Sequence, residues 1–167
     1  QTGTFVGLGW DFSPTGPWRI IPGVSYPYLS WQFGGKAPTV ISGKVDGVAG
    51  QPGGLGVSVA IDGNVVASTF TGANGFYYLA LDPIADGAVL TWLDGRRADG
   101  SESDAIGGSV AMLTRVQPGD ANARVTGLDI GSGRVIVYAG ESTSWDSVSA
   151  MLLARAVGGL TPAQDGV

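Results

Sequence analysis

The pattern of hydrophobic and polar residues along this chain is mainly that of short β-strands. From residue 39 to residue 94, short β-branched and aromatic runs are separated by turns rich in Gly, Asp and Asn, as in an all-β domain. Val57, Val59 and Ile61 alternate with smaller residues, which predicts that they share one face of a strand. The strands expected in this region are 39–45, 57–61, 65–71, 76–81 and 88–93.

Turn signals support these boundaries. Asp62-Gly63-Asn64 is a strong hairpin signal between two predicted strands, because Asp and Gly accept the left-handed backbone of a tight turn. A second turn is expected at 72–75. Asp94-Gly95 is expected to close the strand predicted over 88–93. Residues 95–108 predict an exposed loop. Three further strands are expected at 108–116, 123–130 and 133–138.

The N-terminal part of the chain has a different pattern. The stretch PWRIIPGVSYPYLSW contains two Trp, two Tyr and three Pro and fits neither a helical nor a strand period. Its prolines exclude a helix and restrict any strand to a short or edge position. We expect this segment to lay its rings over an apolar surface, as a cap or seam on a larger β structure. Thr4–Trp10, before it, predicts a short strand.

One helix is predicted, over residues 142–156. Trp145, Val148, Leu152 and Ala156 recur there at helical spacing, as on a helix with one apolar face. The chain is therefore expected to be mainly β, a β-sandwich-like module with appended strands and one C-terminal helix. Its parts are a capping or connecting segment (1–38), the β module (39–140) and the helix with its tail (141–167).

Composition excludes several classes of function. The sequence has no Cys and no His, so disulfides, Cys- or His-ligated metals and a Ser–His–Asp triad are absent. Its net charge is −5, with a pI near 4.4, which argues against nucleic acid as a partner. The longest apolar run, Ala150 to Ala154, is far below the ~20 residues that span a bilayer. We expect no cofactor and no membrane insertion.

Four acidic residues in the loop 94–104 offer a candidate metal site. Hard oxygen ligands in a flexible, Gly-rich loop suit calcium, but Arg96 and Arg97 lie inside the group and would oppose a cation. A solvated loop is the preferred interpretation, and no metal is expected. The acidic residues of this loop, which spans 94–104, are Asp94, Asp99, Glu102 and Asp104.

Two covalent chemistries compete with simpler roles for the residues that could carry them. Lys44 could form an isopeptide bond with Asn64 or Asn74 if a carboxylate such as Asp46 shared its face, but an edge lysine that discourages aggregation is preferred. Glycosidases use paired carboxylates, and the chain has only two glutamates, Glu102 and Glu141. Neither lies in an aromatic-rich strand, so an enzyme is not expected.

Exposed aromatic rings could instead bind a glycan by stacking on its sugar rings. Core packing is the preferred interpretation, because Ile20, Ile21 and Leu29 are interleaved with the rings of this segment. The candidate interaction surface consists of Trp10, Trp18, Tyr26, Tyr28 and Trp31.

Two resemblances bear on function. VISGKVDG at 40–47, followed by VSVAIDGNVVASTFTGANGFYYLALDP at 57–83, resembles carboxypeptidase-regulatory or transthyretin-like β-sandwich modules. The N-terminal segment is similar to the one that closes GLUG-type repeats in filamentous-haemagglutinin-like proteins. The residues that match this second pattern are Phe12, Trp18, Ile20, Tyr26, Pro27, Leu29 and Trp31.

Together these resemblances imply a non-catalytic structural or adhesive module in a secreted or cell-surface adhesin or filament of a Gram-negative bacterium. The implied partners are neighbouring modules of the same precursor, identical subunits in a filament, or surface glycans. Gln1 would then lie at an internal cut of the precursor or at a processed end.

Overall fold

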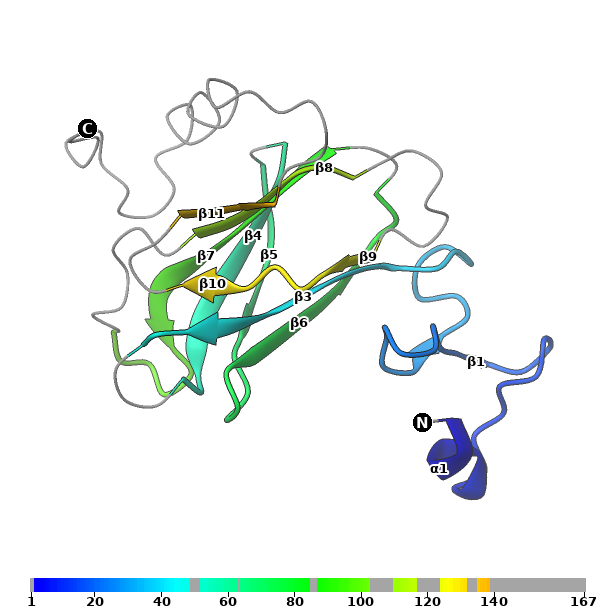
Figure 1. Cartoon of the computed structure of the whole chain (residues 1–167). Helices are drawn as coiled ribbons and strands as arrows, with labels where there is room; N and C mark the ends of the chain where they lie inside the picture. The colour runs from blue at the N-terminus through cyan, green and yellow to red at the C-terminus, as the bar shows by residue number, and fades with distance from the viewer. Residues whose placement is uncertain are drawn as a thin grey trace, which may run out of the picture.

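The computed structural model describes residues 2–48, 52–62, 64–84, 87–102, 110–116, 124–131 and 135–138. Within these ranges the chain is mainly β, as predicted, and its two larger sheets pack face to face (Figure 1). The N-terminal segment carries the one helix found there, α1 (Thr2–Gly7), and a two-stranded ribbon. The C-terminal helix predicted over 142–156 lies outside the described residues.

The smaller of the two sheets is built around β3 (Thr39–Asp46). Antiparallel β6 (Phe76–Leu81) lies on one side of β3, with Ser42 opposite Tyr78. On the other side, β9 (Arg124–Thr126) and β10 (Ile130–Gly131) pair with β3 one after the other, both parallel to it. The single strand predicted over 123–130 is therefore wrong, because it is interrupted at 127–129.

The interruption has a local cause. Gly127 has a φ of +79°, a conformation that glycine adopts readily, and it turns Leu128 into the core. The Asp129 carboxylate then accepts a hydrogen bond from the backbone N–H of Lys44 at 2.8 Å. This side chain takes the place of a ladder partner that the broken strand no longer supplies to β3.

The larger sheet has the strand order β11-β8-β7-β4-β5. In β4 (Leu55–Ile61) and β5 (Asn64–Phe70), Ile61 pairs with Asn64, and Asp62 has a φ of +46°. The predicted hairpin is therefore confirmed. The remaining strands are β7 (Gly87–Arg97), antiparallel β8 (Val110–Val116) and β11 (Val135–Tyr138), which runs parallel to β8.

β7 continues past the predicted stop at Asp94-Gly95. Leu55 on β4 pairs with Arg97, whereas Val57 pairs with Leu93, so β7 carries extra residues between these two pairs. A β-bulge of this kind absorbs a residue such as Gly95, whose φ is +79°. The predicted exposed loop thus begins later than expected, because its first residues still belong to the sheet.

The core lies between the two sheets. It contains Val57 and Val59 from the predicted strand face, together with Ile41, Val89 and Ile130, whereas Ile61, the third residue of that face, is half-buried. The buried Tyr77 side chain crosses this core, and its hydroxyl donates to the carbonyl oxygen of Leu128 at 2.5 Å and lies 3.1 Å from Thr91 Oγ1. The two sheets are therefore joined by polar contacts as well as by apolar packing.

The N-terminal segment confirms one prediction and corrects another. Between the tryptophans it forms only β1 (Trp18–Arg19) and β2 (Tyr28–Leu29), as its prolines require. The strand predicted at Thr4–Trp10 is wrong, because α1 occupies this region. The helix ends where Gly9 adopts a φ of +85° and the N–H of Trp10 donates to the Phe5 carbonyl at 3.1 Å.

Candidate interaction site

Trp10 and Trp18 of the N-terminal segment pack mainly on other rings of the same segment. The Trp10 and Trp18 rings stack with centroids 4.0 Å apart and planes 22° apart. Phe5 on α1 lies 5.1 Å from the Trp10 ring, and Phe12 lies 6.5 Å from it. Aromatic pairs at such distances stabilise a structure beyond their simple burial. We call these four residues the aromatic cluster.

Arg19 holds the loop beside the aromatic cluster. Its guanidinium donates hydrogen bonds to the carbonyl oxygens of Pro14 at 2.7 Å and Gly16 at 2.8 Å. In the same loop Asp11 accepts from the backbone N–H of Ser13 at 2.8 Å, and this bond lowers the pKa of Asp11. The two charged side chains that precede Lys36 therefore stabilise the segment's own fold.

Tyr26 connects this segment to the β-sandwich. Its ring meets the ring of Tyr78 on β6 edge-on, with centroids 4.8 Å apart. Its backbone N–H also donates to the Tyr78 hydroxyl at 3.3 Å. Burial raises the pKa of the Tyr78 hydroxyl above its ordinary value. The predicted contact between the aromatic segment and a β structure is present at this point.

The other predicted surface residues have different surroundings. Tyr28 packs edge-on against the buried Phe33, at 5.7 Å between ring centroids. Trp31 is 62 % exposed and has no ring partner among the described residues. Of the five predicted residues, the structure stacks Trp10 on Trp18, whereas Tyr26 contacts Tyr78, Tyr28 contacts Phe33 and Trp31 is exposed. They do not form one continuous stacking surface.

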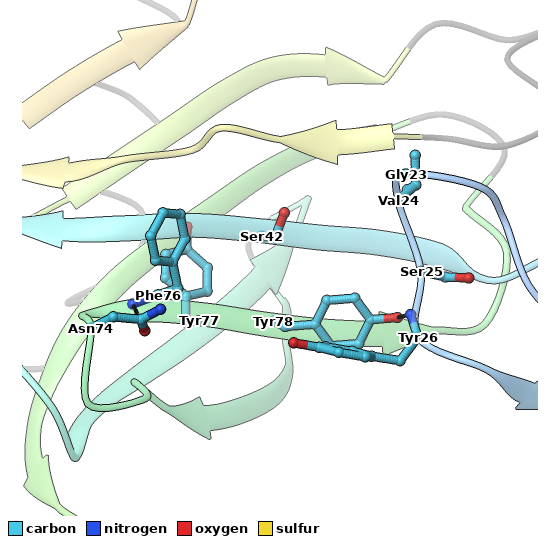
Figure 2. A pocket seen from close by; sticks show the side chains of 9 residues that line it. All are labelled: Gly23, Val24, Ser25, Tyr26, Ser42, Asn74, Phe76, Tyr77 and Tyr78. Atoms are coloured by element: carbon cyan, nitrogen blue, oxygen red, sulfur yellow. Dashed lines mark hydrogen bonds between the residues drawn. The ribbon is translucent and has the colours of Figure 1, made fainter. Parts of the chain in front are cut away.

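An open groove lies where the N-terminal segment meets the smaller sheet (Figure 2). It has a volume of about 270 Å³ and lies between the chain at 23–26 and the outer face of β3 and β6. Ser42 and Tyr78, which are opposite each other in the ladder, lie beneath it. Asn74 and Phe76 line the end that lies away from Tyr26.

Sequence reasoning did not identify this groove. It predicted a strand over 76–81, which contains Phe76 and Tyr78 and is confirmed, and a turn over 72–75, which contains Asn74. What was missed is that Tyr26 packs on this face, because no local pattern reports a contact between residues 52 positions apart. One signal was available in the sequence. Phe76 and Tyr78 place two rings on the outer face of a strand whose alternate residues, including Tyr77, lie in the core.

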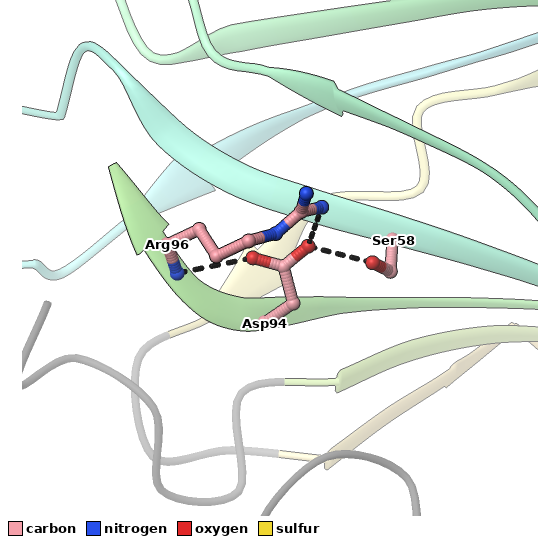
Figure 3. A network of polar contacts seen from close by, with 3 residues as sticks. All are labelled: Ser58, Asp94 and Arg96. Carbon is pink, nitrogen blue, oxygen red and sulfur yellow. Dashed lines mark hydrogen bonds and ion pairs between the residues drawn. The ribbon is translucent and has the colours of Figure 1, made fainter. Parts of the chain in front are cut away.

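The acidic residue Asp94 has a structural role (Figure 3). Its carboxylate accepts hydrogen bonds from the Ser58 hydroxyl at 2.6 Å and from the guanidinium of Arg96. Burial alone would raise the pKa of Asp94, but the bonds from Arg96 and Ser58 outweigh it and lower the pKa. A Cβ at Gly56 would lie 2.1 Å from an Asp94 carboxylate oxygen, so glycine leaves the space this side chain occupies.

The described part of the rest of the acidic loop, up to Glu102, does not assemble around a cation. Asp99 accepts bonds from the N–H and hydroxyl of Ser101, and Glu102 forms a β-bridge with Arg96. Asp104 lies outside the described residues. Within the described ranges, no three acidic side chains lie close enough together to hold a metal ion. The glutamate pair is untested, because Glu141 is outside those ranges too.

Lys44 forms an ion pair rather than a covalent link. Its ammonium lies 2.7 Å from the Asp46 carboxylate, and this contact raises the pKa of Lys44. The Lys44 side chain is 41 % exposed, and that of Asp46, the carboxylate that was expected to share its face, is 57 % exposed. The prediction of an edge lysine is wrong, because β3 has a strand on each side.

Comparison with known proteins does not assign the chain to a family: no family model matches it, and no curated protein is significantly similar. In the part of the chain that the structure describes, no helix is both long and apolar enough to cross a membrane.

Proposed function

We propose that this chain is a structural or adhesive module of a secreted or cell-surface bacterial adhesin or filament, and that it is not catalytic. The observation that carries the proposal is the way the N-terminal segment attaches to the β-sandwich. This segment folds around its own aromatic cluster and meets β6 through Tyr26 and Tyr78. It therefore has the properties of a connector between the sandwich and a neighbouring module.

The polar side chains in the body of the sandwich also support a structural role. Asp94 joins β7 to β4 through Ser58, and Asp129 supplies a missing partner to β3. Tyr77 links the two sheets. Each of these groups stabilises the fold, which is consistent with a module whose task is to stay folded between neighbours.

The proposed partners are the neighbouring modules of one long precursor. A filament of identical subunits is the second arrangement, in which the N-terminal segment of one copy would contact the next. Head-to-tail contacts of this kind generate open fibres when the rotation between subunits does not close a ring.

The experiment compares the full chain with a variant that begins at Lys36. If the segment is a connector, the shortened chain keeps its β-rich circular dichroism spectrum and unfolds cooperatively. Loss of folding on deletion would make the segment part of the core and overturn the connector. Light scattering on both chains separates the two arrangements, because only the filament predicts association of the full chain that deletion abolishes.

A further inference from the structure

The groove between the N-terminal segment and β6 has a specific chemical character. Phe76 is 55 % exposed and Tyr26 is 68 % exposed, although both are large rings whose burial would normally stabilise the protein. They lie at opposite ends of the groove, with Tyr78 between them (Figure 2). The groove thus offers aromatic surface that is held in place but left open.

Polar groups accompany these rings. Asn74 uses its side-chain oxygen to accept a hydrogen bond from the N–H of Phe76 at 3.2 Å. Its amide NH₂ group remains available as a donor. That NH₂ group has no partner among the described residues. Ser42 contributes a hydroxyl that can both donate and accept. The groove therefore combines ring faces with neutral hydrogen-bonding groups.

No charged side chain lines the groove among the described residues. Lys44, which is opposite Phe76 in the ladder, is paired with Asp46. An anionic ligand would thus lack a counter-charge, and the net charge of −5 would repel it. A cationic ligand would find no carboxylate among the residues that line the groove. The ligand that fits is neutral.

A neutral ligand that needs both ring faces and hydrogen-bonding groups is a sugar. The C–H groups on one face of a pyranose pack on the negative face of an aromatic ring, while its hydroxyls pair with amides and hydroxyls. The volume of about 270 Å³ is near the lower end of small-ligand sites, roughly 300–1,000 Å³. A peptide added as a strand would instead use the backbone at a sheet edge, whereas this groove lies on a side-chain face.

We propose that this groove binds a neutral saccharide, with Phe76 and Tyr26 stacking on the sugar and Asn74 and Ser42 bonding to its hydroxyls. Tyr26 reaches the groove only because its ring and N–H pack on Tyr78. The site is therefore complete only while the N-terminal segment is seated on β6. This binding function goes beyond the connector role and does not depend on it.

The test uses the full chain on an array of neutral, sialylated and sulfated oligosaccharides. Binding should be confined to neutral glycans. The strongest neutral oligosaccharide on the array is then titrated into the protein by NMR, where the aromatic resonances of Tyr26, Phe76 and Tyr78 should shift. Selective binding of the charged glycans, or no shift with any neutral saccharide at millimolar concentration, would overturn the proposal.

Two variants target the groove with little expected effect on folding. Phe76→Thr removes an exposed ring and keeps a residue that favours strands. Asn74→Asp keeps the oxygen that accepts from Phe76 and removes the NH₂ donor. Each should weaken saccharide binding about tenfold or more, equal to about 1.4 kcal/mol. Their circular dichroism spectra should match that of the unmodified chain.

Trp31→Ala is the matched control, since Trp31 is a similarly exposed ring that does not line the groove. Its affinity should be unchanged. Loss of binding in Trp31→Ala, with Phe76→Thr unaffected, would place the glycan site elsewhere and overturn the proposal. Loss in Phe76→Thr alone would leave the connector function intact, because that function is tested by the deletion.

Discussion

Gly43 on β3 lies directly against the backbone of Leu128, so closely that a Cβ at position 43 would be 2.1 Å from the Leu128 carbonyl oxygen. The same Cβ would be 2.8 Å from the Tyr77 hydroxyl. The close approach lies at the interruption between β9 and β10, where Leu128 enters the core. Glycine is required there because a larger residue would clash with the Leu128 backbone. Its backbone conformation is not the reason, because its φ is not positive.

Gly43→Ala is therefore expected to destabilise the protein strongly. The atoms it meets are mainly backbone, which cannot rotate away, so the cost should be about 1–3 kcal/mol or more, as for other overpacked cores. Urea unfolding measures this cost. Gly7→Ala is the control, because a Cβ there meets nothing within 4 Å, and it should change stability little. Equal stability of the two variants would contradict the close contact.

A second prediction concerns the hydroxyl of Tyr77. Tyr77→Phe keeps the ring in the core but removes the bonds to the Leu128 carbonyl and to Thr91. Because the Leu128 carbonyl would lose a buried partner, we expect a loss of about 1–3 kcal/mol. Tyr28→Phe is the matched control, since the Tyr28 hydroxyl has no hydrogen bond among the described residues. A Tyr77→Phe protein as stable as this control would show that the hydroxyl does not stabilise the sandwich.

The features that the sequence predicted correctly are those set by local chemistry. The hairpin predicted over 57–61 and 65–71 and observed as β4 and β5 follows from Asp62-Gly63 between alternating apolar residues, since turn type and register are fixed by neighbours. The short strands of the N-terminal segment follow from its prolines. In each example the deciding atoms lie within a few residues of one another.

The features that the sequence did not predict depend on contacts between distant residues. The break between β9 and β10 depends on Asp129 meeting Lys44, 85 residues away. The groove exists because Tyr26 meets Tyr78. The helix α1 was missed for a different reason: its six residues include two glycines and no clear period. Its one ring, Phe5, contacts Trp10 and Phe12 only after the segment has folded.

The third prediction is that the protein is insensitive to calcium. The Asp94 and Asp99 carboxylates are engaged by Ser58, Arg96 and Ser101, and no metal-binding group is found in the described ranges. Thermal midpoints in EDTA and in excess calcium should therefore agree. A rise of several degrees with calcium would indicate a site that binds the native state, and it would restore the acidic loop as a metal centre.

The last prediction is that Asp94 contributes to acid sensitivity. Its side chain is only 10 % exposed, and burial alone would raise its pKa. The bonds from Arg96 and Ser58 outweigh burial, and the pKa in the folded protein lies below the ordinary value of 3.8. A carboxyl with a lowered folded pKa stabilises the protein above its unfolded pKa, and this stabilisation is lost as the pH falls through the folded value.

Two variants test this relationship. Asp94→Ala should cost about 1–3 kcal/mol at pH 7, because Ser58 loses its partner, and the difference from the unmodified protein should shrink as the pH falls below the ordinary carboxyl pKa. Arg96→Met should raise the pKa of Asp94, so acid unfolding should begin at a higher pH. Arg97→Met is the control, since Arg97 is not among the groups that shift the pKa of Asp94. If urea unfolding at a series of pH values gives the same profile for Arg96→Met and Arg97→Met, the ion pair does not set the acid response.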